Sequence, residues 1–308
     1  MECIGECLAT RREGPGAPLL LHSVVGYVGS MLIRTGYDIV LEYAASTPVL
    51  AMLYYHPSRE ASVRHRQGLG IDPRVRIEDY TDSFGNRCAR LIAGAGQIRF
   101  RNEGLVEDSG EPDRQEPGAK QHEIYALPDE ALSFLLSSRY CEVDRMLDVA
   151  WQLFSDTRPG WARVQAVCDF VHQHLRFDYL EARSTRSAYE AYQERVGVCR
   201  DFTHLAVTLC RCLNIPARYC TGYLGEIGVP ATDEPMDFSA WFDAYLGGAW
   251  HTFDARNNTP RVGRILMARG RDAADVALLT SFGPSRLVQF TVRTEEVPEE
   301  TPKGRALR

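Results

Sequence analysis

The sequence lacks three features that assign proteins to broad classes: an excess of positive charge, a cysteine pattern and a long uninterrupted apolar run. Its 35 lysine and arginine residues are outnumbered by 41 aspartate and glutamate residues, which gives a formal net charge of −6. A surface built mainly for nucleic acid carries the opposite charge, as does one built for an acidic membrane, so we expect no nucleic acid and no membrane partner. With 308 residues and 44% hydrophobic content, the chain is long enough for two folded domains.

The nine cysteines show no pairing pattern. Their number is odd, no two of them stand in C-x-x-C spacing, and Cys3 and Cys7 have no second pair downstream. Domains stabilised by disulfides and structural zinc sites need such patterns, so the sequence predicts neither. We therefore expect reduced thiols, no metal, no cofactor and a cytoplasmic location.

Residues 17–33 form the most apolar stretch near the start of the chain, but His22, Ser23, Gly26 and Gly29 interrupt it. A membrane-spanning helix needs about 20 predominantly apolar residues, and no small-residue cleavage site is clear. Two explanations remain open, a signal peptide and an upstream extension ahead of a start at Met31, of which we favour the extension. We expect residues 1–35 to be poorly ordered.

Short alternating apolar segments between residues 37 and 100 predict strands separated by turns. They indicate a small antiparallel β-domain over residues 36–106. Residues 107–122 are rich in acidic residues, glycine and proline, so a linker is expected over residues 107–125.

The rest of the chain alternates helical and strand-like segments, which predicts an α+β domain over residues 126–293 and a disordered tail over residues 294–308. Helical spacing of apolar residues predicts helices that open at residue 128, run over 144–154 and 161–175, and follow residue 199; strands are predicted over 217–224, 238–245, 250–254 and 282–292.

One cysteine, Cys199, stands where a loop becomes a strongly apolar helix. Gly197 precedes it and is expected to supply the turn, while Phe202, Leu205 and Leu209 follow at helical spacing. Unpaired N–H groups and the helix dipole favour a thiolate at this position. The sequence therefore predicts that Cys199 has a lowered pKa and is a nucleophile.

Five motifs then follow in order: Gly197-Val198-Cys199-Arg200-Asp201-Phe202, Asn214-Ile215-Pro216-Ala217-Arg218-Tyr219, Gly222-Tyr223-Leu224, Ala240-Trp241-Phe242 and Phe253-Asp254. Their order resembles the bacterial transglutaminase-like superfamily, fused to its usual small N-terminal β-domain, over residues 36 to about 293. The resemblance implies a papain-like core of helices packed on an antiparallel sheet. It also implies a Cys-His-Asp site with the cysteine on a helix and the other two residues on adjacent strands.

Carried onto this sequence, the resemblance implies Cys199 as the nucleophile and Asp254 as the carboxylate that orients the base. The family's histidine stands immediately before the Ala-Trp pair, and that position is Ser239 here. A serine cannot take a proton from a thiol near neutral pH, so the three-residue mechanism lacks its base. The structural alternatives are a hydrogen-bonded strand hydroxyl for Ser239 and, for Asp254, a salt bridge to Arg256 or Arg261.

Two other histidines are candidates for the base. A two-residue turn at residues 247–248 places Ser239 and Asp254 on one strand face and His251 on the other, so His251 qualifies only if a bulge intervenes. His204 lies about 140° around the helix from the cysteine and is expected to pack behind the site.

Two functions remain open. The favoured one is cysteine-dependent acyl transfer or hydrolysis at an amide or thioester, peptidase- or amidase-like, with a thioacyl intermediate on Cys199 and a peptide or small amide or thioester as substrate. Protein cross-linking is less expected because no calcium-loop pattern is present. The alternative, favoured by Ser239, is a catalytically impaired protein that binds a peptide or small molecule in the retained cleft.

Overall fold

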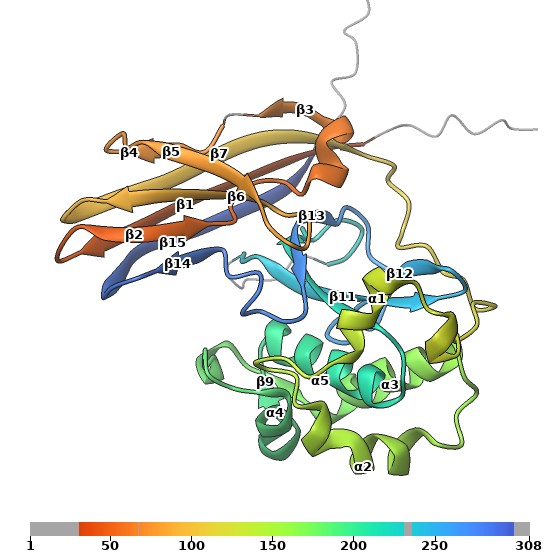
Figure 1. Cartoon of the computed structure of the whole chain (residues 1–308). Coiled ribbons are helices and arrows are strands. Elements are labelled where there is room, and N and C mark those ends of the chain that lie inside the picture. The colour runs from red at the N-terminus through yellow and green to blue at the C-terminus, as the bar shows by residue number, and fades with distance from the viewer. Residues whose placement is uncertain (1–30, 67, 231–235, 299–308) are drawn as a thin grey trace, which may run out of the picture.

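The computed structural model describes residues 31–66, 68–230 and 236–298, and it consists of three antiparallel sheets and a layer of helices (Figure 1). The predicted extension up to residue 30 and the tail from residue 299 lie outside the described residues. Within them, no helix is long and apolar enough to cross a membrane.

The first two sheets face each other and share one core. Alternating residues of β1, among them Ile39, Leu41 and Tyr43, are buried against Ala89 and Leu91 of β6. This alternation confirms the predicted antiparallel β-unit. The first sheet contains β15 (Ser285–Val297), β1 (Met31–Tyr43), β7 (Gly96–Asp108), β3 (Val63–Arg66) and β4 (Gly70–Asp72); the second contains β14 (Leu279–Ser281), β2 (Thr47–Ala51), β6 (Arg87–Ala93) and β5 (Ile77–Thr81).

The last two strands return to this first unit. β15 pairs with β1 along its whole length, and β14 pairs with β2. The prediction from the sequence placed most of these residues in the second domain. Pairing between strands more than 200 residues apart leaves no local signal in the sequence. The predicted limits also differ at residues 31–35 and 294–297, which are strand residues here, and at β7, which continues to Asp108.

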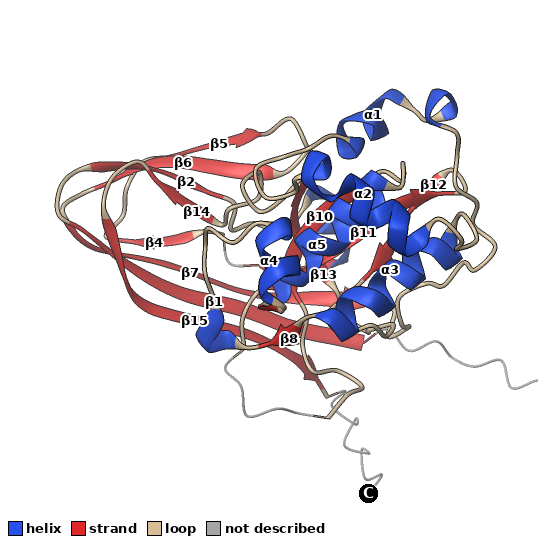
Figure 2. Cartoon of the chain, turned by 90° about the horizontal axis from the view of Figure 1, so that it is seen from below, coloured by secondary structure: helices blue, strands red, loops and turns tan. Residues whose placement is uncertain are grey.

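The third sheet lies between the helices and the first unit (Figures 1 and 2). Its outer face shares a core with the first unit, since Tyr223 and Met267 pack with Ile33 and Tyr55. The sheet runs β12 (Ala249–Phe253), β11 (Ser239–Leu246), β10 (Ala217–Tyr223) and β13 (Ile265–Gly270), and the short β8 (Arg176–Phe177) and β9 (Val196–Gly197) pair in parallel elsewhere.

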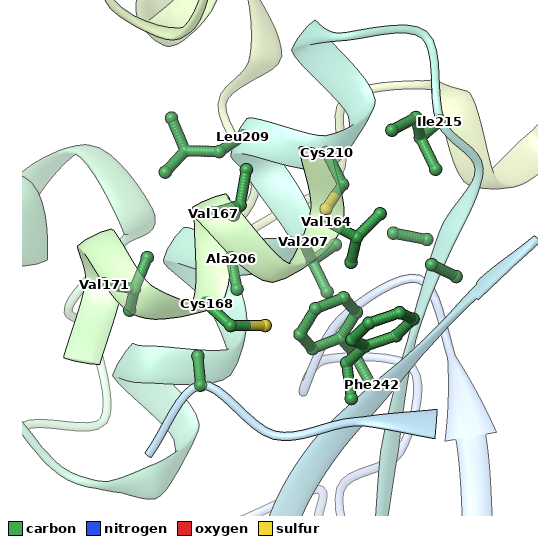
Figure 3. Close-up of a cluster of buried hydrophobic side chains, with 14 of the residues drawn as sticks. Val164, Val167, Cys168, Val171, Ala206, Val207, Leu209, Cys210, Ile215 and Phe242 are labelled. Carbon is green, nitrogen blue, oxygen red and sulfur yellow. The ribbon is translucent and has the colours of Figure 1, made fainter. Parts of the chain in front are cut away.

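The helical face of the third sheet is covered around one central helix, α5. Every residue of α5 from Asp201 to Cys212 is buried, and Leu205 and Leu209 share a core with Val164 and Phe242, part of which Figure 3 shows. The predicted helices over 144–154, 161–175 and after residue 199 are confirmed. The α-helices are α1 (Asp129–Leu132), α2 (Val143–Phe154), α3 (Trp161–His174), α4 (Ala188–Glu194) and α5 (Cys199–Cys212), with 3₁₀ turns η1 (Pro57–Ser62), η2 (Ile124–Ala126), η3 (Ser133–Leu135) and η4 (Tyr179–Glu181).

The β11–β12 hairpin has the predicted register. Ala244 is opposite His251, and the turn residues Gly247 and Gly248 have φ angles of 59° and 87°, which side chains other than glycine adopt at a cost. The hairpin thus fixes which residues of β11 share a face with the residues that follow β12.

Candidate active site

The start of α5 is held by a buried carboxylate. The Val198 N–H donates to Asp201 Oδ2 at 2.9 Å, and the Arg186 guanidinium lies 3.2 Å from the same oxygen. A Cβ on Gly197 would come within 2.6 Å of the Asp201 Cβ. Gly197 is therefore needed for close approach of this side chain, whereas the sequence had given it the role of a turn residue, and its φ is not positive.

Cys199 is the first residue of α5 and the one described cysteine that is not buried. It packs with Ala240 of β11 and Tyr219 of β10, and the Ala240 N–H acts to lower the pKa of its thiol. The thiol thus lies beside position 239, where the family's histidine would stand.

The electrostatics of Cys199 differ from the prediction. Burial raises the pKa of the Cys199 thiol to about 11, the Arg256 guanidinium opposes this rise, and the Asp237 carboxylate adds to it. The prediction of a lowered pKa was wrong, because desolvation and the negative charge of Asp237 raise this pKa. Near pH 7 the sulfur is a neutral thiol.

Ser239 is the first residue of β11 and is partly exposed. Its backbone carbonyl accepts a hydrogen bond from the Thr221 hydroxyl at 3.1 Å. The residue lines a pocket of about 390 Å³ together with Tyr179, Asp237 and Arg256. A ligand in this pocket would therefore lie against the position that a histidine occupies in the family.

Asp254 is buried, and both of its oxygens are occupied. Oδ1 accepts the backbone N–H groups of Arg256 and Asn257 at 3.0 and 2.9 Å, and Oδ2 accepts Asn257 Nδ2 at 2.7 Å and Arg264 Nη2 at 2.8 Å. Its ion-pair partner is Arg264, neither of the two arginines considered from the sequence. Burial raises the pKa of Asp254, but Arg264 and Asn257 outweigh it and hold that pKa below its usual value.

The position of Arg264 supports the predicted strand faces. Its guanidinium lies 5.1 Å from the centre of the Trp241 ring, so Asp254 and Trp241 are on the same side of the hairpin. The neighbouring residues Phe242 and Phe253 stack on the opposite, helical side with ring centres 5.7 Å apart.

The two histidines that the sequence offered as the base, His251 and His204, make other contacts. His251 bonds to the Leu246 carbonyl at 3.1 Å and packs on Trp161 of α3, on the helical side as predicted. His204 is fully buried, its Nε2 accepts the Ala273 N–H at 3.1 Å, and burial lowers its pKa well below the usual value. Among the residues that the structure describes, no histidine is hydrogen-bonded to Asp254 or to the Cys199 sulfur.

Two residues near the site were missed from the sequence. Arg264 follows Asp254 after an irregular loop, and no spacing rule pairs two such residues. Asp237 stands two residues before Ser239, so strand alternation alone could have placed both on one side. Among the described residues, no group of three or more histidine, cysteine, aspartate or glutamate side chains could hold a metal ion.

The chain is similar to several known proteins. Residues 149–255 match the family model for the transglutaminase-like superfamily. "Uncharacterized protein ML0607" of Mycobacterium leprae is 37% identical over 224 residues, which are 70% of this chain and 78% of that protein. The periplasmic domain of TgpA from Pseudomonas aeruginosa is 11% identical, with a TM-score of 0.38 over 74% of this chain and 88% of that chain.

A further solved structure is similar over almost the whole chain. It is named "The Crystal Structure of a Putative Cysteine Protease from Cytophaga hutchinsonii", and it has a TM-score of 0.76 and 29% identity over 88% of this chain and 92% of that chain. This coverage includes both the first β-unit and the helical unit. With its motifs, its fold and these similarities, the chain belongs to the transglutaminase-like superfamily and has the fold of a cysteine-dependent enzyme.

Proposed function

We propose that this protein transfers the acyl group of an amide or thioester to Cys199 and then to water, as a peptidase- or amidase-like hydrolase. The observation that carries the proposal is the partly buried Cys199 at the start of α5, which packs against Ala240, next to Ser239 and its pocket of about 390 Å³. A peptide or a small amide or thioester would enter this pocket beside Ser239 and Arg256.

Backbone N–H groups support the same chemistry. The first four N–H groups of a helix have no i→i−4 acceptor. At the start of α5 the Val198 N–H bonds to the Asp201 carboxylate, and the Asp201 N–H bonds to the Val198 carbonyl. The N–H groups of Cys199 and Arg200 remain at the helix start, where they would stabilise the negative oxygen of a tetrahedral intermediate.

A second function is favoured by the groups that the site lacks. Position 239 holds a serine, the thiol is neutral near pH 7, and Asp254 is bound by Arg264. With a pKa of about 11, only about one Cys199 thiol in 10⁴ is ionised at pH 7. A protein that binds a peptide in the same pocket without cleaving it would have these properties.

One experiment distinguishes the two functions. Wild-type protein and Cys199→Ala are incubated with a peptidyl thioester, and the protein mass and the released thiol are followed with time. Hydrolysis predicts an acyl adduct on Cys199 and thiol release that the variant loses. Cys88→Ala, which removes a buried thiol of β6, should behave like wild type. Saturable peptide binding with equal, background thiol release from wild type and Cys199→Ala would instead support the binding function and contradict hydrolysis.

A further inference from the structure

The thiol of Cys199 needs a proton acceptor. Three carboxylates are candidates, and two of them are already paired with an arginine. Asp201 is fully buried and bonded to Arg186 and to the Val198 N–H. Asp254 accepts four hydrogen bonds, one of them from Arg264. Taking a proton at either residue would break a buried ion pair, which is strongly unfavourable.

The third carboxylate, Asp237, is different. It is partly exposed and accepts a hydrogen bond from the Phe238 N–H to Oδ1 at 2.6 Å, and no other described residue donates a hydrogen bond to it. It has no salt bridge to a described lysine or arginine. It also lines the 390 Å³ pocket with Ser239 and Arg256.

The backbone directs Asp237 toward this pocket. The Phe238 ring points the other way, into the core shared with the first unit, with its centre 5.1 Å from that of Tyr223 and 6.1 Å from that of Tyr37. Successive side chains of an extended segment point to opposite sides, so Asp237 and Ser239 share the pocket side.

Cys199 packs with Ala240, the residue next to Ser239, so the thiol and the Asp237 carboxylate lie near the same end of β11. The Asp237 carboxylate raises the pKa of the Cys199 thiol, and the Arg256 guanidinium acts on both groups in the opposite direction. Burial raises the pKa of Asp237 itself, which makes its carboxylate a stronger base than one in water.

We propose that Asp237 is the proton acceptor of Cys199 in this chain and serves as the base that Ser239 cannot provide. This role rests on the hydrolase function proposed above. In the acylation step the S–H proton passes to Asp237, directly or through one water, as the sulfur bonds to the carbonyl carbon. The carboxylic acid then protonates the leaving amine or thiol as the C–N or C–S bond breaks.

Deacylation uses the same group in the same way. Water gives a proton to the Asp237 carboxylate as its oxygen bonds to the thioacyl carbon. The bond between that carbon and the Cys199 sulfur breaks, and the proton returns to the sulfur. The thiol and the carboxylate are restored, and no oxidant, reductant or metal is needed.

The test compares the full-length wild type with Asp237→Asn, Asp237→Glu and Glu103→Gln. Glu103 is an exposed carboxylate of β7, so its variant controls for the change in net charge. Two rates are measured in each protein: hydrolysis of a peptidyl thioester, and alkylation of Cys199 by iodoacetamide between pH 6 and pH 11.

The hydrolysis rate and the alkylation rate together distinguish a base from a residue with only a structural role. If Asp237 is the base, Asp237→Asn lowers hydrolysis by a factor on the order of 10²–10⁴. Its alkylation at pH 8 becomes faster, because the loss of a negative neighbour lowers the thiol pKa. Asp237→Glu should regain part of the hydrolysis, and Glu103→Gln should match wild type in both rates.

Three results would overturn the role of Asp237. Hydrolysis by Asp237→Asn at the wild-type rate overturns it while the hydrolase function stands. Equal losses of hydrolysis and alkylation also overturn it, because they indicate a disturbed pocket. If wild type shows no hydrolysis that depends on Cys199, the hydrolase function fails and the role of Asp237 fails with it.

Discussion

The thiol of Cys199 should have an unusual pH profile, because burial and Asp237 hold its pKa at about 11. We predict that its alkylation by iodoacetamide is slow at pH 7 and rises roughly tenfold per pH unit to about pH 11, whereas alkylation of an unfolded cysteine reaches half its maximal rate at about pH 8.5. Among the described cysteines Cys199 should still react first, since the other six are buried. Peptide mass spectrometry after timed labelling measures this, and a plateau below pH 9 would contradict it.

Ser239→His should lower the apparent pKa of the Cys199 thiol. An imidazole beside the sulfur can form a thiolate–imidazolium pair, and the variant should therefore be alkylated faster than wild type at pH 7. Ser239→Asn, which adds a side chain of related size without a base, is the matched control.

The gain in thioester hydrolysis from Ser239→His should remain partial. Asp254, the carboxylate that would orient the new ring, is bound by Arg264. An alkylation profile identical in wild type and Ser239→His would mean that position 239 does not face the cysteine.

At the scale of single residues, the sequence predicted that Cys199 stands at a helix start but not the charge state of its thiol. Cys199 was found from its place between a glycine and an apolar helix. The pKa of its thiol depends on burial and on Asp237 and Arg256, which folding brings together from outside α5. The partner of Asp254 was missed for the same reason, because Arg264 is placed by an irregular loop.

At the scale of elements, the start of α5 depends on close contact between Gly197 and Asp201. We predict that Gly197→Ala destabilises the protein by about 1–3 kcal/mol, because the new methyl group would overlap the Asp201 side chain. Gly94→Ala is the control, since a Cβ there has no described atom within 4 Å. Urea unfolding measures both, and a Gly197→Ala loss no larger than that of the control would contradict the prediction.

Elements with a strong local pattern were predicted well. Apolar spacing gave α2, α3 and α5, and the Gly247–Gly248 pair gave the hairpin register that puts His251 on the helical side. The short strands β3 and β4 were not predicted, because four residues or fewer carry too little periodicity and their pairing with β7 decides their form.

At the scale of the whole molecule, the two predicted domains share more than a linker. β15 crosses back to β1, and the core of the first unit continues into the third sheet through Tyr223 and Met267. The candidate site therefore lies in a unit whose outer face depends on the first one. Sequence patterns describe each segment by itself, so they could not reveal that the end of the chain completes the first sheet.

Arg264 connects the predicted linker to the site, because its guanidinium binds Asp113 at 2.8 Å and Asp254 at 2.8 Å. We predict that Arg264→Ala lowers the free energy of unfolding at pH 7 by about 3–5 kcal/mol, because it leaves two carboxylates without their cation. Arg286→Ala, which removes an exposed pair with Glu42, should cost about 1 kcal/mol or less.

The loss in Arg264→Ala should depend on pH with a definite sign. In wild type the pKa of Asp254 is below its usual value of 3.8, so its contribution to stability is present above about pH 4 and is lost as the pH falls through that lowered pKa. In the variant, burial without Arg264 raises the pKa of Asp254 instead, so the variant gains relative to wild type as the carboxylate becomes protonated. Urea unfolding at pH 7 and pH 4 should therefore give a smaller difference between the two proteins at pH 4. An equal difference at both pH values would show that Arg264 contributes through packing alone, and that the charge of Asp254 does not depend on it.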